Sequence, residues 1–226
     1  MTELQQIEKT NLRFQARAAI RAQIVTGGLR PGDIYPVNYF SAQLGVSATP
    51  AREALLDLAN EGLIELVRNR GFRIVELSDR DLDEILEIRL LLEVPAIRKA
   101  AGCLDPEEIS ACLRLAELAE ESVAKGDLSG FVSADRDFHL RMMAPANNGR
   151  LIELIGQLRD QARLPGLQSA ARTVSLAIAG EEHRSILRAV ASGDADVAER
   201  LLRDHLAHTR AEWAGKPASS TNDGDH

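Results

Sequence analysis

The segment Leu44–Leu56, LGVSATPAREALL, has the features of the turn and second helix of a helix-turn-helix. Gly45 suits the tight turn between the helices, because glycine adopts positive φ angles without steric cost. Ser47 is a suitable N-cap residue, and Pro50 fits a first helical turn, where its missing N–H is harmless. Apolar residues then recur at helical spacing, so one face of this helix is expected to pack on a small core.

The polar residues at the start of this second helix predict contact with DNA. Thr49 and Arg52 are expected to face outward, where a recognition helix presents side chains to the major groove. Ser47, just before them, belongs to the same predicted surface. We therefore interpret the chain as a DNA-binding regulator whose remaining residues control the binding.

A hairpin follows the helix-turn-helix. Residues 63–68 and 72–77 are rich in β-forming side chains, and a glycine-containing turn separates them. Such a hairpin, placed directly after a helix-turn-helix, is the wing of a winged helix. Its predicted tip combines the cation of Arg70 with Gly71, a residue small enough to approach a minor groove. Residues 1–78 are thus predicted to form a winged helix-turn-helix domain.

From Ser78 onward the pattern is helical throughout. Ser78 with Asp81 resembles a capping box, and Asp105 followed by Pro106 is a second strong start signal. The helices are expected over about residues 79–101, 106–125, 128–143 and 148–164, then a shorter helix, and finally 180–192 and 194–213. We predict an all-helical domain over 79–214 and a disordered tail over 215–226. The fold class is therefore mainly α, a winged helix-turn-helix plus an all-α bundle.

Composition and charge agree with this division. The net charge of −7 comes from residues 79–226, because residues 1–78 carry nine Lys/Arg against eight Asp/Glu. A near-neutral first part and an acidic second part favour DNA contact by the first alone. No apolar run reaches the roughly 20 residues that span a bilayer, so we expect a cytoplasmic protein without membrane contact. Cys103 and Cys112 are expected to be buried, reduced thiols.

Four residues in the helical part have the spacing of metal ligands. Asp135 and His139 are four residues apart on one predicted helix, and His183 and His205 come from the last two long helices. One aspartate and three histidines suit a divalent transition metal, with zinc preferred and nickel or manganese as alternatives. From spacing alone, surface or core histidines explain the pattern as well, and His208 competes with His205.

The motifs together resemble the GntR superfamily of bacterial regulators, in particular its FadR-like branch with a C-terminal FCD ligand-binding domain. The resemblance covers about residues 12–213 and rests on two motif sets in the expected order. The first set is Pro31-Gly32, Leu44–Ser47, Thr49–Leu55, Glu61–Leu63 and Arg70-Gly71; the second is Asp135–His139, Asn148, Glu182–Leu187, Gly193-Asp194 and His205. It implies a winged-helix homodimer on a palindromic operator, with a helical domain that dimerises and holds a metal or a small carboxylate.

The resemblance also assigns roles to residues. The four residues with metal-ligand spacing match the family's metal ligands, Arg52 matches a DNA-contacting arginine, and Gly71 matches the wing glycine. Arg89 stands where an arginine faces the effector pocket, although a salt bridge explains it as well. Asn148 lines that pocket or caps its helix.

The sequence departs from the family at two positions. Asn38 and Ala48 replace usual arginines, which removes two expected cationic DNA contacts. Arg68, Arg70 and Arg73 on the predicted wing are able to compensate.

The function predicted from these observations is a metabolite-responsive transcription factor, a repressor whose DNA binding is gated by a small carboxylate effector at the metal site. We expect no enzymatic activity, since no acid–base pair accompanies the predicted ligands. A metal-dependent enzyme acting on a small organic acid is one alternative, which consumption of the acid would reveal. An interaction protein that does not bind DNA is the other, and sequence-selective DNA binding excludes it.

Overall fold

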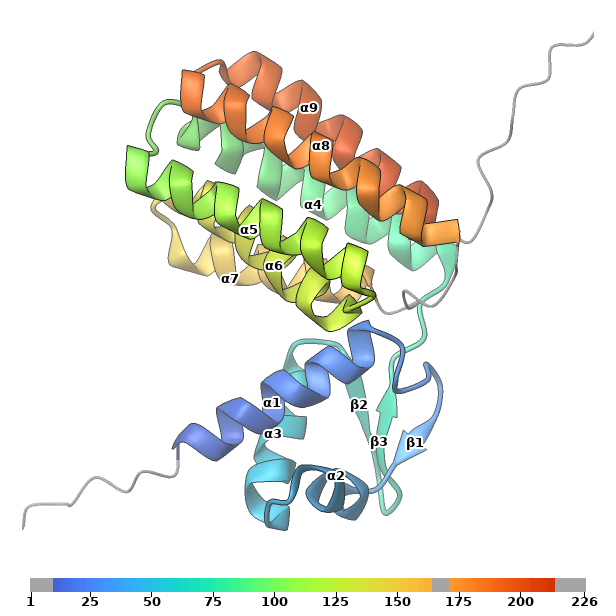
Figure 1. Cartoon of the computed structure of the whole chain (residues 1–226). Coiled ribbons are helices and arrows are strands. Elements are labelled where there is room, and N and C mark those ends of the chain that lie inside the picture. Colours follow the sequence, from blue (N-terminus) through green and yellow to red (C-terminus); the bar gives the residue numbers. More distant parts are fainter. Residues whose placement is uncertain (1–9, 164–170, 214–226) are drawn as a thin grey trace, which may run out of the picture.

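The structure is a computed structural model that describes residues 10–163 and 171–213. A bundle of long helices forms one part of the molecule, and a smaller unit with a sheet forms the other (Figure 1). Helix α1 of the smaller unit lies against the bundle. The predicted disordered tail falls outside the described residues.

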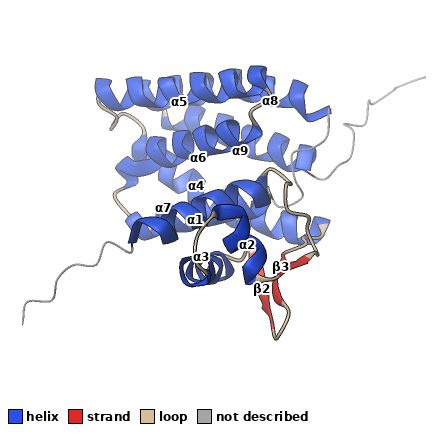
Figure 2. Cartoon of the chain, turned by 60° about the horizontal axis from the view of Figure 1, so that its bottom comes forward, coloured by secondary structure: helices blue, strands red, loops and turns tan. Residues whose placement is uncertain are grey.

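The smaller unit is a three-helix cluster with a three-stranded sheet. The sheet is antiparallel in the order β1-β3-β2, and its β2–β3 hairpin protrudes beside α2 and α3 (Figure 2). The elements are α1 (Thr10–Val25), β1 (Ile34–Tyr35), α2 (Val37–Leu44), α3 (Ala48–Asn60), β2 (Ile64–Val67) and β3 (Gly71–Ile74). This is the predicted winged helix-turn-helix. The two-residue strand β1 was not predicted, because it is too short for an alternating pattern.

The turn between α2 and α3 follows the sequence prediction in its backbone. Gly45 ends α2 with a φ of 64°, the left-handed conformation that glycine adopts freely. Ser47 is the N-cap residue of α3, but it makes no side-chain capping bond within the described part of the chain, contrary to expectation. The core beneath this turn contains the buried side chains of Phe40, Ala54, Leu55, Leu58, Phe72 and Ile74.

The bundle begins at the predicted Ser78. Ser78 and Asp105 are the N-caps of α4 and α5, and each forms a complete capping box with the residue three positions later. The helices are α4 (Asp79–Ala100), α5 (Pro106–Lys125), α6 (Leu128–Met143), α7 (Gly149–Ala162), α8 (Ala171–Ser192) and α9 (Ala195–Trp213), with a 3-10 turn, η1 (Ala144–Ala146), after α6. Its core is mostly aliphatic and includes Ile97, Phe138, Met142, Ile155, Ile186 and Leu202. The division of the chain into domains at Ser78 remains our interpretation.

Two expectations for this part were wrong. One helix, α8, covers the stretch for which we predicted a short helix and then a second one from Gly180. Gly180 lies inside α8 beside Glu120 of α5, and a glycine inside a helix costs only about 1 kcal/mol relative to alanine. Cys103 is exposed, not buried, since it lies in the turn after α4; Cys112 is buried, and both are free thiols. Among the described helices, none is long and apolar enough to cross a membrane.

Candidate functional site

Three histidines from three helices converge inside the bundle. His139 of α6, His183 of α8 and His205 of α9 are buried, and one ligand atom from each lies within 4.8 Å of the others. The Nε2 atoms of His139 and His183 are 3.1 Å apart. Asp135, one turn before His139, places its Oδ1 atom 3.2 Å from His183 Nε2 and 3.8 Å from His139 Nε2. We call these four residues the acid–histidine cluster.

The spacing of the cluster fits a metal ion. Two ligand atoms 2.0–2.1 Å from a tetrahedral zinc are about 3.3–3.4 Å apart, and the contacts among Asp135, His139 and His183 bracket that value. His205 has its Nδ1 atom 2.8 Å from Glu182 Oε2, the carboxylate–histidine arrangement that orients a metal-ligating imidazole. The Nδ1 atoms of His139 and His183 are buried without a hydrogen-bond partner among the described residues. The donor set therefore suits zinc or a similar ion.

The protonation states also suit metal binding. Burial, reinforced by Arg159, holds the pKa of His139 well below its ordinary value, so the ring is neutral at pH 7. Burial also lowers the pKa of His205, although Glu182 opposes this shift. Burial alone would raise the pKa of Asp135, but the charge of Arg163 and a hydrogen bond with His183 outweigh it and hold the pKa well below its usual value. Neutral imidazoles and an ionised carboxylate are the forms that bind a cation.

Arg159 of α7 and Arg163, the C-cap residue of that helix, adjoin the cluster, and sequence analysis missed both. Arg163 contacts Asp135 Oδ2, and Arg159 Nη1 lies 3.9 Å from the same oxygen. Both side chains are buried, and the Nε atom of Arg159 is without a partner among the described residues. Burial lowers the pKa of Arg159 to about 10, which leaves it charged at pH 7. The site thus offers two guanidinium groups beside its carboxylate, which is the chemistry that binds a carboxylate ligand.

The two predicted effector contacts, Arg89 and Asn148, lie at different distances from the acid–histidine cluster. Arg89 is buried and its Nε atom donates to Glu93 Oε1 at 2.8 Å, while Glu93 also contacts Arg159. Among the described residues, Arg89 is therefore connected to the cluster through Glu93 and Arg159. Asn148 is exposed at the N-cap of α7, where its side chain accepts a hydrogen bond from Leu151 N–H. It lies eleven residues before Arg159, about 16 Å along the helix, so the structure does not bring it to the cluster.

The predicted DNA-contacting residues of α3 lie on its exposed side. Thr49 and Arg52 in the first turns of α3 are exposed, as is Ser47. Ala51, Ala54 and Leu55 of the same helix are buried. Asn38 and Ala48, which replace the usual arginines, are also exposed. The structure therefore orients this part of α3 toward solvent, as a recognition helix requires, with contact to DNA remaining a prediction.

The geometry of the β2–β3 hairpin explains why residue 71 is a glycine. A Cβ atom at Gly71 would lie 2.2 Å from the carbonyl oxygen of Tyr35, and its φ of 129° disfavours other residues. A glycine is thus required where β3 begins beside the end of β1, and a role of Gly71 in DNA binding stays a prediction. Arg68 and Arg70 are exposed near the hairpin tip. Arg73 forms an ion pair with Glu65 on the facing strand, with Nη1 3.6 Å from Oε2. Arg73 is therefore partly neutralised within the wing.

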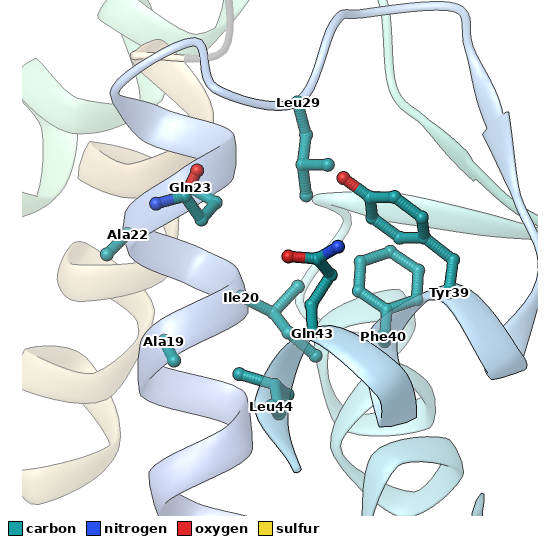
Figure 3. A pocket seen from close by; sticks show the side chains of 9 residues that line it. All are labelled: Ala19, Ile20, Ala22, Gln23, Leu29, Tyr39, Phe40, Gln43 and Leu44. Atoms are coloured by element: carbon teal, nitrogen blue, oxygen red, sulfur yellow. The ribbon is translucent and has the colours of Figure 1, made fainter.

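A hollow of about 360 Å³ lies between α1 and α2, away from the cluster (Figure 3). Tyr39 and Gln43 of α2 point into it opposite Ile20 of α1. Its nine lining residues include no acid, histidine or cation. It does not resemble the predicted metal or carboxylate site.

Comparison with known families identifies both parts. Residues 12–74 match the model described as bacterial regulatory proteins, gntR family, and residues 84–208 match the FCD domain. The chain belongs to the GntR family, with an FCD domain. Like its relatives, this GntR-family protein is a transcriptional regulator and not an enzyme.

The relatives cover most of this regulator. It is 33% identical over 203 residues to a probable D-xylose utilization operon transcriptional repressor of Paenarthrobacter nicotinovorans, covering 89% of this chain and 88% of that protein. It is 32% identical over 152 residues to the regulator McbR of Escherichia coli, covering 67% of this chain and 69% of McbR. The solved structure of E. coli McbR/YncC matches 89% of this chain and 96% of its own with a TM-score of 0.81 at 28% identity. A putative GntR regulator from Rhodococcus sp. RHA1 matches 92% of this chain and 100% of its own, with a TM-score of 0.73 at 26% identity.

Proposed function

We propose that this GntR-family regulator is a repressor of the FadR-like branch. It binds a palindromic operator as a homodimer, and a small carboxylate at the acid–histidine cluster sets its DNA affinity. The observation that carries the proposal is the convergence of three buried histidines and Asp135 beside two buried arginines, in the FCD domain of a chain that also holds a winged helix-turn-helix. Relatives named as repressors of D-xylose utilization and gluconate operons support the sign of regulation.

In this proposal the four cluster residues hold a divalent transition metal, with zinc favoured by the mixture of imidazole and carboxylate. When bound, the ion supplies a positive charge that attracts a carboxylate. Arg159 and Arg163 orient the ligand with their guanidinium groups, and Glu93 in turn holds Arg159. The ligand acts on DNA only if it binds one arrangement of the dimer more tightly than the other.

The DNA half is tested by Arg52→Ala. A duplex that wild type selects from a random pool is titrated by fluorescence anisotropy at fixed salt. Removal of a bidentate base contact costs about 1–3 kcal/mol, so we expect roughly 5- to 150-fold weaker binding. Arg80→Ala, in the exposed Arg80–Glu84 pair of α4, is the control and should bind as wild type does. Equal affinity of Arg52→Ala and wild type would remove Arg52 from the DNA interface.

The homodimer is supported by an exposed apolar stripe on α4. Ile88 and Leu91 are 43% and 67% exposed, and Pro95 one turn further is exposed on the same side. A palindrome has two equivalent half-sites, so the protein that reads it needs a second copy. We propose that this stripe packs against that copy.

Leu91→Glu tests this surface, because it places a charge in the centre of the stripe. In light scattering, wild type should have twice the 24.6 kDa mass of the chain, and the variant should have the mass of one chain. Leu113→Glu, at an exposed leucine of α5, should stay dimeric. A Leu91→Glu protein that remains a dimer would place the interface elsewhere.

A further inference from the structure

The last turns of α7 face two ways. Arg159 and Arg163, four residues apart, point to Asp135 inside the bundle. Asp160 and Gln161 point instead to the winged unit, because successive residues on a helix are about 100° apart. Asp160 Oδ2 lies 3.2 Å from Arg21 Nε of α1, and Gln161 Nε2 donates to the carbonyl oxygen of Glu61 at 2.7 Å.

Helix α6 likewise has two successive residues that contact different partners. Asp135 belongs to the acid–histidine cluster, and the next residue, Arg136, donates from Nε to Asp160 Oδ2 at 3.3 Å. Asp160 is therefore held by one arginine from the winged unit and one from the bundle. Helix α6, which supplies Arg136, and helix α7, which carries Asp160, each also hold a residue that adjoins or belongs to the acid–histidine cluster, Asp135 and Arg159.

Arg21 also contacts the C-terminal end of α3, the proposed recognition helix. Glu61 is the C-cap of α3, and its carboxylate binds Arg21 and lies 3.1 Å from Arg17 Nε of α1. Arg21 thus joins Asp160 of α7 to Glu61 at the end of α3. These ion pairs connect α7 to the helix that is proposed to read DNA.

The junction contains a hollow, and two of its buried polar atoms, Arg21 Nε and Asp160 Oδ1, make no hydrogen bond within the described residues. A hollow of about 320 Å³ between α1, α6 and α7 is lined by Arg21, Arg136 and Asp160 together with Ser129 and Ser133. Asp160 is only 1% exposed, and its Oδ1 atom is without a hydrogen-bond partner among the described residues. Because a buried carboxylate separated from its cations is strongly destabilised, Asp160 constrains how the two parts rearrange.

We propose that Asp160 is a positioning residue that couples the acid–histidine cluster to the orientation of the DNA-binding unit, through Arg21 and Arg136. A ligand that draws Asp135, Arg159 or Arg163 into new contacts moves the turns of α6 and α7 that hold Asp160. This inference rests on the proposed function, because it assumes that the cluster binds a ligand and that the winged unit binds DNA.

The test measures zinc affinity of the full-length protein, free and bound to the duplex that wild type selects. If zinc changes DNA affinity, DNA changes zinc affinity by the same factor. For wild type we expect the two zinc affinities to differ by about tenfold, within the usual range of allosteric coupling. For Asp160→Asn the ratio should fall to within about twofold of one, with the zinc affinity of the free protein retained. A merely structural role would not remove this ratio selectively.

Two further variants complete the test. Arg21→Gln breaks the same contact from α1, where the arginine side chain is 17% exposed, and should also abolish the ratio. Asp57→Asn is the matched control, because it removes an ion pair between Arg13 of α1 and Asp57 of α3 that stays inside the winged unit. Arg13 Nε donates to Asp57 Oδ2 at 2.7 Å. This control variant should keep the wild-type ratio.

The outcomes separate this inference from the proposed function. A wild-type ratio in both Asp160→Asn and Arg21→Gln would overturn the role of Asp160, while leaving the metal site and DNA binding in place. Equal zinc affinities for free and DNA-bound wild type would overturn the coupling itself. A wild-type protein that binds no zinc, or selects no duplex, would refute the proposed function and this inference with it.

Discussion

Glu93→Gln is expected to destabilise the protein by about 3–5 kcal/mol, the cost of breaking a buried ion pair. Glu93 is fully buried, with Arg89 Nε 2.8 Å from Oε1 and Arg159 against Oε2. The glutamine fills the same space but leaves two buried guanidinium groups without their shared negative charge. At roughly 2–4 °C per kcal/mol, thermal unfolding should shift downward by about 6–20 °C.

This destabilisation should depend on pH. Burial alone would raise the pKa of Glu93, but Arg159 and Arg89 outweigh it, so its folded pKa lies below the ordinary value of 4.5. A lowered folded pKa gives stability that is present above the unfolded pKa and lost as pH falls through the folded one. Wild type and Glu93→Gln should therefore differ by a constant amount above about pH 5, and the difference should shrink at lower pH.

The matched control for this prediction is Glu84→Gln on the same helix. Glu84 also pairs with an arginine four residues away, since Arg80 Nε lies 2.9 Å from its Oε1, but both side chains are exposed. Exposed pairs contribute about 0–1 kcal/mol, so thermal unfolding of Glu84→Gln should stay within about 4 °C of wild type. Equal melting temperatures for Glu93→Gln and Glu84→Gln would show that the buried network does not hold α4 to α7.

His183→Ala is expected to abolish stabilisation by zinc. An ion that binds only the folded state stabilises wild type by about 4 kcal/mol at a thousand times its Kd, or roughly 8–16 °C in thermal unfolding. His183 Nε2 is 3.1 Å from His139 Nε2 and 3.2 Å from Asp135 Oδ1, so the alanine removes the ligand that contacts both. The variant should therefore show no increase in melting temperature on addition of zinc.

The zinc-dependent shift, not the absolute melting temperature, is the relevant quantity here. His183 packs against Phe138 with ring centroids 4.6 Å apart, so its removal also leaves a cavity. His208→Ala is the control, because His208 is an exposed histidine of α9 outside the cluster. Its Nδ1 atom lies 2.6 Å from Glu182 Oε1, but Glu182 keeps its contact with His205 through Oε2, so the zinc shift should equal that of wild type. A full zinc shift in His183→Ala would exclude His183 as a ligand.

Local sequence signals predicted the elements that depend on local chemistry. Ser78 and Asp105 start their helices as predicted, because a capping box is formed by residues three positions apart. Gly45 ends α2 because its positive φ suits glycine. Strand β1 and the continuous helix α8 were missed, because pairing with β3 and packing on α5 determine them, not the local pattern.

The residues of the candidate site also divide into those that the sequence indicated and those that only tertiary packing brings together. The spacing of Asp135 and His139 identified one helix face, and His183 and His205 were added as histidines of the last two long helices. The family resemblance favoured this set over surface or core histidines, and the structure places the four residues together. Glu93, Arg159 and Arg163 had no comparable signal. Their importance arises from interhelical packing, which brings residues 66 positions apart in sequence into one buried ion pair. Two arginines four residues apart, such as Arg159 and Arg163, are otherwise typical of a solvent-exposed helix face.

The most direct test of the central claim is a crystal structure of the zinc-soaked protein with diffraction recorded on both sides of the zinc absorption edge. The account predicts one anomalous peak per chain, about 2.0–2.2 Å from ligand atoms of Asp135, His139, His183 and His205. Well-ordered density for these four side chains without a peak among them, or a peak bound elsewhere in the bundle, would contradict it.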